Sequence, residues 1–168
     1  INIHTFHSLC LSILKENYEK AGLSEDFKVI SEQEKTLYKE EEITKDMLVF
    51  DDLITLTVKL FEDYPEIAQT YRERFKYLSV DEYQDIDENQ YKLIKHLSPD
   101  NGNICAIGDP NQAIYGFRGG SSKFFNNFQQ DYPDVEIINL KNNYRSTESI
   151  VNASNQMIET YNIVSKYD

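Results

Sequence analysis

Two carboxylates stand at the end of an apolar stretch in the sequence YLSVDEYQDID, residues 77–87. The run FKYLSV, residues 75–80, is typical of a short buried strand, and Asp81 and Glu82 follow it directly. Open α/β sheets bind ligands at the carboxyl ends of their strands. There, one carboxylate can hold Mg²⁺ together with water and substrate phosphates, and its neighbour can orient and deprotonate an attacking water. We therefore predict a metal-binding and water-activating pair at Asp81 and Glu82.

Three more acidic residues, Asp85, Asp87 and Glu88, follow within a few positions, just before or at the start of a helical pattern over 88–97. Acidic side chains at a helix N-terminus interact favourably with the helix dipole. We interpret these three residues as helix-starting acids rather than as ligands.

A second candidate stretch is AIGDPNQAIYGFRGG, residues 106–120. It follows another short strand, so we expect it at the same sheet edge as Asp81. Asp109 and Pro110 open a turn, and the amide of Gln112 can contact a phosphate oxygen or the attacking water. Aromatic residues beside an arginine can stack on the bases of a single strand, at about 1–3 kcal/mol per base; here they are Tyr115, Phe117 and Arg118. Taken alone, this segment is a weak signal, because an aromatic-Gly-Arg sequence more often forms a packed turn than a nucleic-acid contact.

A third stretch is LKNNYRSTESI, residues 140–150. Residues 135–140 have a strand pattern, and Ser146 or Thr147 can cap a C-terminal helix that has Glu148 in its first turn. Arg145 precedes that cap and can reach toward an anion at the sheet edge, although an ordinary surface arginine has the same sequence context.

Short β-branched runs alternate with segments whose apolar residues recur every three or four positions. We expect strands at 1–5, 75–80, 103–108 and 135–140, and helices at 6–21, 50–63, 65–75, 88–97 and 146–161. This alternation predicts an α/β fold with a mainly parallel sheet. Residues 50–63 are apolar enough to form a core helix, and residues 22–46 are expected to be a polar excursion on the surface.

Composition limits the classes of protein to consider. A length of 168 residues predicts one domain, and the hydrophobic fraction of 40% is ordinary for a globular protein. We find no apolar run long enough to cross a membrane and no secretory leader, and we read Cys10 and Cys105 as reduced, buried thiols, so we expect a cytoplasmic protein. The net charge of −12, most of it from residues 1–100, predicts that any contact with nucleic acid is local.

Five of these stretches, taken in order, resemble the superfamily 1 DNA helicases of the UvrD, Rep and PcrA type. They are TFHSL (5–9), FDDLI (50–54), VDEYQD (80–85), GDPNQAIYGFRGG (108–120) and NYRST (143–147). The resemblance implies that residues 1–168 form part of the first RecA-like motor domain, of the P-loop NTPase type, incomplete at the N-terminus. It implies an ATP-dependent DNA helicase that moves on single-stranded DNA, acts at junctions of duplex and single strand, and serves DNA repair.

The same resemblance assigns roles to matching residues. Asp81 would hold the Mg²⁺ of Mg-ATP, Glu82 would act as general base, Gln112 would sense the γ-phosphate, and Arg145 would stabilise charge on the transferring phosphoryl group. Single-stranded DNA would be contacted by Thr5, His7, Tyr115, Phe117 and Arg118. Asp51 and Asp52 are interpreted as structural.

The chain also departs from the family pattern. Phe117 stands where many relatives have tryptophan, and residues 22–46 replace a larger helical insertion. The phosphate-binding motif GxxxxGK[ST] does not occur in residues 1–168. We therefore expect the rest of the nucleotide site to come from the remainder of the same polypeptide, and the isolated chain to be nearly inactive. Two alternatives stay open, a non-catalytic module that binds DNA or a partner, and a metal-dependent nuclease built on the acidic strand end.

Overall fold

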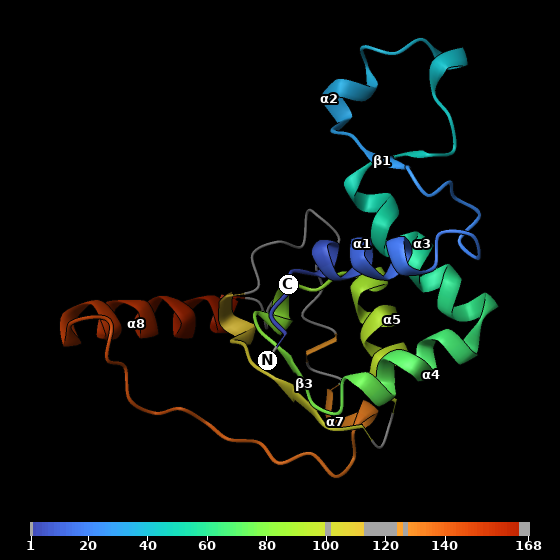
Figure 1. Ribbon diagram of the computed structural model, residues 1–168. Helices are drawn as coiled ribbons and strands as arrows, with labels where there is room; N and C mark the ends of the chain where they lie inside the picture. Colours follow the sequence, from blue (N-terminus) through green and yellow to red (C-terminus); the bar gives the residue numbers. More distant parts are fainter. Residues whose placement is uncertain (1, 100–101, 113–123, 126–127, 165–168) are drawn as a thin grey trace. The chain divides into compact units, whose positions relative to one another are not determined.

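The computed structural model describes residues 2–99, 102–112, 124–125 and 128–164. The chain divides into two compact units, Ile1–Tyr132 and Pro133–Asp168, and each is described by itself. Among the described residues, unit 1 contains α1 (Phe6–Glu16), β1 (Lys28–Val29), α2 (Glu32–Lys35), η1 (Glu40–Glu42), β2 (Met47–Leu48), α3 (Phe50–Asp63), α4 (Pro65–Arg74), β3 (Leu78–Val80), η2 (Tyr83–Asp85), α5 (Glu88–Leu97), β4 (Ile104–Ala106), η3 (Pro110–Gln112) and α7 (Phe128–Asp131) (Figure 1). Unit 2 contains α8 (Glu148–Val164).

The strands pair in parallel, as predicted for an α/β fold. β3 pairs with β4, so that Leu78 lies opposite Ile104 and Val80 opposite Ala106. β1 pairs with β2 in a second parallel pair. Each of these described sheets has two strands, so the fuller RecA-like sheet remains a prediction.

α3 is the central helix of the core, as its apolar density predicts. It packs against α1, α4 and α5 (Figure 1). Its buried residues are Leu53, Ile54, Thr57, Val58, Leu60 and Phe61. At its start, the side chain of Asp52 accepts a hydrogen bond from the backbone N–H of Val49 at 2.9 Å, which confirms a structural role for Asp52.

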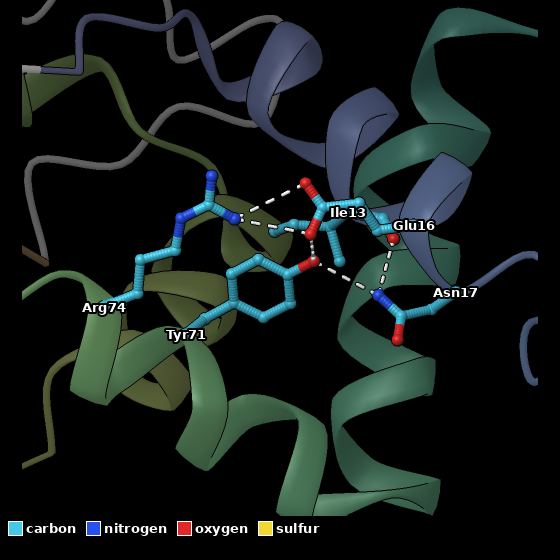
Figure 2. A network of polar contacts seen from close by, with 5 residues as sticks. All are labelled: Ile13, Glu16, Asn17, Tyr71 and Arg74. Carbon is cyan, nitrogen blue, oxygen red and sulfur yellow. Dashed lines mark hydrogen bonds and ion pairs between the residues drawn. The ribbon is translucent and has the colours of Figure 1, made fainter.

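A polar network joins the end of α1 to α4 (Figure 2). The Tyr71 hydroxyl donates to Glu16 at 2.8 Å and accepts from Asn17 Nδ2 at 3.1 Å. Arg74 Nη1 lies 3.3 Å from the same Glu16 carboxylate, and Asn17 Nδ2 also donates to the carbonyl of Ile13 at 2.8 Å. Burial, followed by the contact with Glu16, raises the pKa of Tyr71 to about 12. The phenol therefore stays a neutral donor, and the network fixes α1 on α4.

Residues 22–46 are polar but anchored at several points. Leu23, Phe27 and Ile30 are buried, and the β1–β2 pair brings Lys28 opposite Met47. The backbone N–H of Ser24 donates to Asp46 at 2.7 Å. The excursion is thus tied down by its own strand pair, with α2 and η1 between the strands.

Two predicted strands are wrong. Among residues 2–5 there is no strand, because Thr5 already serves as the N-cap of α1. Residues 135–140 have no regular structure, and Leu140 is 91% exposed. A strand needs a partner for its backbone hydrogen bonds, and the described residues of unit 2 provide no second strand. The helices agree with prediction, although α1 ends at Glu16 rather than near residue 21.

The two cysteines differ in exposure, which corrects the prediction that both are buried. Cys10 is fully buried in the core, whereas Cys105 is exposed. The reason is the alternation of side chains along a strand. Cys105 lies opposite Ser79 in the β3–β4 pair, on a face where both residues are exposed.

We expect the native chain to react with a thiol reagent at pH 8 at one cysteine only. Cys10 is inaccessible, and burial raises its pKa to about 11, so that little of the reactive thiolate is present. Counting fast-reacting thiols before and after unfolding tests this, with Cys105→Ser as the control that should show no fast thiol. Two fast thiols in the native chain would contradict the buried position of Cys10.

Candidate functional site

The two predicted motifs leave the same edge of the β3–β4 pair. After Val80 and Ala106, which lie opposite each other, the backbone pairing continues: Ile107 N donates to Val80 O at 2.8 Å and Tyr83 N donates to Ile107 O at 3.0 Å. The segment from Asp81 and the segment leading to Asp109 therefore emerge side by side. For residues 106–112, this confirms the prediction that the stretch 106–120 shares a sheet edge with Asp81; residues 113–120 lie outside the described residues.

Asp81 and Glu82 are both exposed at this edge. Asp81 Oδ1 accepts a hydrogen bond from the Glu82 N–H at 3.0 Å, and Asp81 Oδ2 accepts none from the described residues. Glu82 has φ 50° and ψ 41°, and among the described non-glycine residues it alone has a positive φ. Left-handed backbone is uncommon for such residues and tends to be kept at functional sites.

Buried neighbours hold this strained backbone in place. Tyr83 is fully buried, with ring contacts to Phe128 at 5.2 Å and Phe125 at 6.1 Å between centroids, and Ile86 is 2% exposed. Burial raises the pKa of the Tyr83 phenol, with smaller contributions from Tyr132 and Asp131. Since the residues after Glu82 are fixed in the core, the carboxylate of Glu82 is carried on a rigid turn.

Gln84 connects the two motifs, and the sequence analysis did not identify it. Its side chain is 1% exposed. Nε2 donates to Glu82 Oε2 at 2.7 Å and to Asp85 Oδ2 at 3.3 Å, while Oε1 accepts from the backbone N–H of Asp109 at 3.1 Å. A glutamine between acidic residues has no distinctive sequence pattern. The available signals are that it lies within the stretch VDEYQD and that it closely follows Asp81 and Glu82, which were predicted to bind metal and activate water.

The turn at 108–112 is organised by Asp109. Asp109 Oδ1 accepts from Asn111 N at 3.0 Å, and Asp109 Oδ2 accepts from Gln112 Nε2 at 2.9 Å. Gln112 itself is exposed at the end of η3. Its amide is thus oriented by Asp109 and remains accessible to a ligand at this edge.

The helix-starting interpretation is confirmed for Asp87 and Glu88. Asp87 caps α5 by accepting from Gln90 N at 2.8 Å, and Glu88 lies in the first turn. Asp85 instead contacts Gln84, and its Oδ1 is buried with no hydrogen-bond partner among the described residues.

Arg145 belongs to unit 2, so its approach to the Asp81 edge stays a prediction. Its backbone N–H and that of Ser146 both donate to Asn143 Oδ1 at 2.9 Å, just before α8 begins at Glu148. The carbonyl of Thr147 accepts from Ile150 and Val151 at 3.1 Å, which places Thr147 at the start of the helix. The Arg145 side chain is exposed.

The residues predicted to contact DNA fall into two groups. Tyr115, Phe117 and Arg118 lie outside the described residues. Thr5 and His7 lie at the start of α1, where the His7 ring meets the Phe50 ring edge-on at 5.8 Å between centroids. Both have structural contacts in the fold, and DNA contact by either remains a prediction.

Thr5 forms a reciprocal capping box with Ser8. Ser8 N donates to Thr5 Oγ1 at 3.2 Å and Thr5 N donates to Ser8 Oγ at 2.9 Å. We expect Thr5→Ala to lower the free energy of unfolding by about 1 kcal/mol, because an orphan N–H of α1 loses its acceptor. Urea unfolding measures this, with Thr44→Ala as the control, since Thr44 is exposed and its side chain makes no hydrogen bond with the described residues. Equal effects of the two substitutions would contradict the capping role.

A cavity of about 360 Å³ lies at the opposite end of β3, away from Asp81. Arg72 and Lys76 line it, and α4 and α5 both end at its wall. Arg72 lies in the last turn of α4, and its Nη1 donates to the carbonyl of His96, in the last turn of α5, at 2.9 Å. The Arg72 guanidinium thus has a partner within the protein, and we assign no ligand to the cavity.

The donor chemistry of the Asp81 edge fits Mg²⁺ with a nucleotide. Among the described residues, no group of three or more His, Cys, Asp or Glu side chains is arranged to hold a metal ion. Mg²⁺ bound with a nucleotide does not need such a group, because it uses one or two carboxylates, water and phosphate oxygens. Asp81 Oδ2 is available for this.

In the described part of the chain, no helix is both long enough and apolar enough to cross a membrane.

Comparison with known proteins agrees with the motifs. A family model of the UvrD/REP helicase N-terminal domain matches residues 1–48 and 36–133. The ATP-dependent DNA helicase PcrA of Staphylococcus aureus is 46% identical over 112 residues, which cover 67% of this chain and 15% of that protein. PcrA of Staphylococcus epidermidis shows the same identity and coverage. The chain therefore spans about 15% of the length of these relatives. These matches confirm the resemblance found in the motifs, and the chain belongs to the UvrD/REP helicase N-terminal domain family.

Proposed function

We propose that this chain is part of the ATP-hydrolysing motor of a DNA helicase that moves along single-stranded DNA. The observation that carries the proposal is the common sheet edge, where Asp81 and Glu82 emerge beside the turn that presents Gln112 and Gln84 joins Glu82 to that turn. The names of the relatives, ATP-dependent DNA helicases, support the same activity.

In this proposal the residues divide the work as follows. Asp81 binds Mg²⁺ through its exposed carboxylate, and Glu82 orients the attacking water and accepts its proton. Gln112 contacts the γ-phosphate, and Arg145 stabilises charge on the transferring phosphoryl group. Mg-ATP supplies the phosphoryl group and a positive charge that neutralises the phosphate oxygens. The protein's contribution is to hold the carboxylates and the amide on rigid turns.

We further propose that residues 1–168 contribute part of a RecA-like motor domain whose phosphate-binding loop comes from elsewhere in the same polypeptide. Thr5, His7, Tyr115, Phe117 and Arg118 would contact single-stranded DNA, and the whole protein would act at duplex junctions in DNA repair, in the cytoplasm. The short segment of residues 22–46 would take the place of the family's larger helical insertion. Support for these points is the family membership and the motif order.

We expect the isolated chain to hydrolyse ATP at least about 10³-fold more slowly than the longest natural polypeptide that contains it. The reason is that a phosphate-binding loop supplies the backbone amides and the lysine that hold the β- and γ-phosphates. The test compares Mg²⁺-dependent ATP hydrolysis by the two proteins, with and without single-stranded DNA.

The outcomes separate the alternatives. Hydrolysis stimulated by single-stranded DNA in the longer protein supports the motor. Robust turnover by the isolated chain, abolished by Glu82→Gln, would show that its nucleotide site is complete. Binding of DNA without hydrolysis in both proteins would favour a non-catalytic module, and cleavage of the DNA would favour a nuclease.

A further inference from the structure

We propose that Gln84 is a positioning residue that fixes Glu82 and the turn 108–112 relative to each other, so that the base and the phosphate sensor move as one unit. The proposal rests on the proposed function for its catalytic consequence. It rests on the hydrogen bonds of a single buried amide for its structure. The two motifs are residues 80–85 and 108–120. Among their described residues, only Gln84 forms side-chain hydrogen bonds to both motifs.

The orientation of the Gln84 amide is determined by its partners. Nε2 faces two carboxylate oxygens, which only accept hydrogen bonds, at 2.7 Å and 3.3 Å. Oε1 faces the N–H of Asp109, which only donates, at 3.1 Å. Rotating the amide by 180° would place oxygen against two carboxylates and NH₂ against an N–H. The amide is therefore held in one orientation by all three of its contacts.

Close packing keeps the Gln84 amide within hydrogen-bond distance of the Asp109 N–H. Gln84 is 1% exposed and lies between the buried residues Tyr83 and Ile86 of the same turn. On the other side is Gly108, where a Cβ atom would lie 2.3 Å from Gln84 Oε1 and 3.2 Å from both Tyr83 N and the Phe125 ring. Only a residue without a side chain lets the backbone of the turn come this near to the amide.

The bridge extends beyond Gln84 in both directions. On one side Nε2 holds Oε2 of Glu82, the predicted base. On the other, Asp109 donates its N–H to Gln84 and accepts from Gln112, the predicted sensor, at 2.9 Å. The path from base to sensor is thus a continuous chain of three hydrogen bonds. Because it is contiguous and its centre is buried, a shift of the turn is transmitted to the carboxylate.

Two substitutions break the bridge in different ways. Gln84→Met keeps the length of the side chain and removes all three hydrogen bonds. Gly108→Ala retains every polar group but forces the turn and Gln84 Oε1 apart, because its Cβ would overlap Oε1. The matched control is Ile86→Val, which makes a cavity beside the bridge without touching it. Thermal unfolding of all variants sets a temperature at which each is folded.

The first measurement is amide hydrogen exchange in the chain itself. For Gln84→Met and Gly108→Ala we expect the Asp109 N–H to exchange about 10-fold faster, as loss of one hydrogen bond predicts, and Ile86→Val to leave it unchanged. Unchanged protection of Asp109 in both bridge variants would overturn the proposal, whatever the activity of the protein.

The second measurement is steady-state ATP hydrolysis by the longest natural polypeptide that contains this chain. Both bridge variants should lower kcat by about 10–100-fold and change KM for ATP by less than about 3-fold, because a misplaced base slows chemistry more than binding. An unchanged kcat, in a wild-type protein that is active and is inactivated by Glu82→Gln, would overturn the catalytic role of the bridge. A wild-type protein with no ATP hydrolysis at all would instead overturn the proposed function, and the exchange result would still decide the structural bridge.

Discussion

Glu82→Gln is expected to slow ATP hydrolysis by about 10²–10⁴-fold in the polypeptide that contains this chain, with nucleotide affinity retained. General bases typically contribute this much to a rate. The substitution keeps the local hydrogen bonding, since the new amide oxygen can still accept the hydrogen bond that Gln84 Nε2 donates to Glu82 Oε2 at 2.7 Å. Basicity is lost while the bridge is kept. Single-turnover hydrolysis together with nucleotide binding measures both quantities.

Glu88→Gln is the matched control for this loss. Glu88 is an exposed glutamate close to Glu82 in sequence, and its contact with Lys92 at 3.9 Å is an exposed ion pair that contributes little to stability. The Glu88→Gln variant should hydrolyse ATP at the wild-type rate. A similar loss of hydrolysis in both variants, or a normal rate for Glu82→Gln, would show that Glu82 is not the general base.

Phe61→Ala is expected to lower the free energy of unfolding by about 3–5 kcal/mol, the range found for large-to-small changes of buried aromatic residues. Phe61 is 1% exposed on α3, and its ring lies 5.9 Å from the rings of both Tyr71 and His96. Its removal leaves a cavity where α3, α4 and α5 meet. Urea unfolding of the chain, followed by far-UV circular dichroism, measures the change.

Phe50 provides the comparison on the same helix. Its side chain is 56% exposed and meets His7 at the edge of the core. Phe50→Ala should therefore cost less than about 1 kcal/mol. If Phe61→Ala and Phe50→Ala lowered the free energy of unfolding equally, the face of α3 that carries Phe61 would not be the buried one.

The helices and the main strand pair could be predicted because their patterns are local. The apolar spacing of α3 gives its range, and Asp87 marks the start of α5 by its type and position. The pairing of β3 with β4 follows from two short apolar runs on either side of a helix. That pairing also predicts that Asp81 and the Asp109 turn lie at the same sheet edge.

What could not be predicted depends on contacts between distant residues. Gln84 gains its role from Asp109, which comes close only when Val80 pairs with Ala106. Residues 135–140 have the composition of a strand, but composition does not supply a hydrogen-bonding partner. Cys105 lies in an apolar run, yet which of the alternating side chains faces solvent depends on what covers that face. The wrong predictions are therefore those in which tertiary context decides the outcome.

The left-handed backbone at Glu82 has a consequence for how this position can change over time. A non-glycine residue in that conformation costs the fold on the order of 1–2 kcal/mol, and glycine or asparagine would adopt it with less strain. Either replacement would make the turn more favourable and would remove the carboxylate. Selection for a more stable domain and selection for hydrolysis thus act in opposite directions on this one residue. A relative that has given up ATP hydrolysis would be free to drift toward glycine or asparagine here, so the residue type at this position is a marker of whether the motor is still in use.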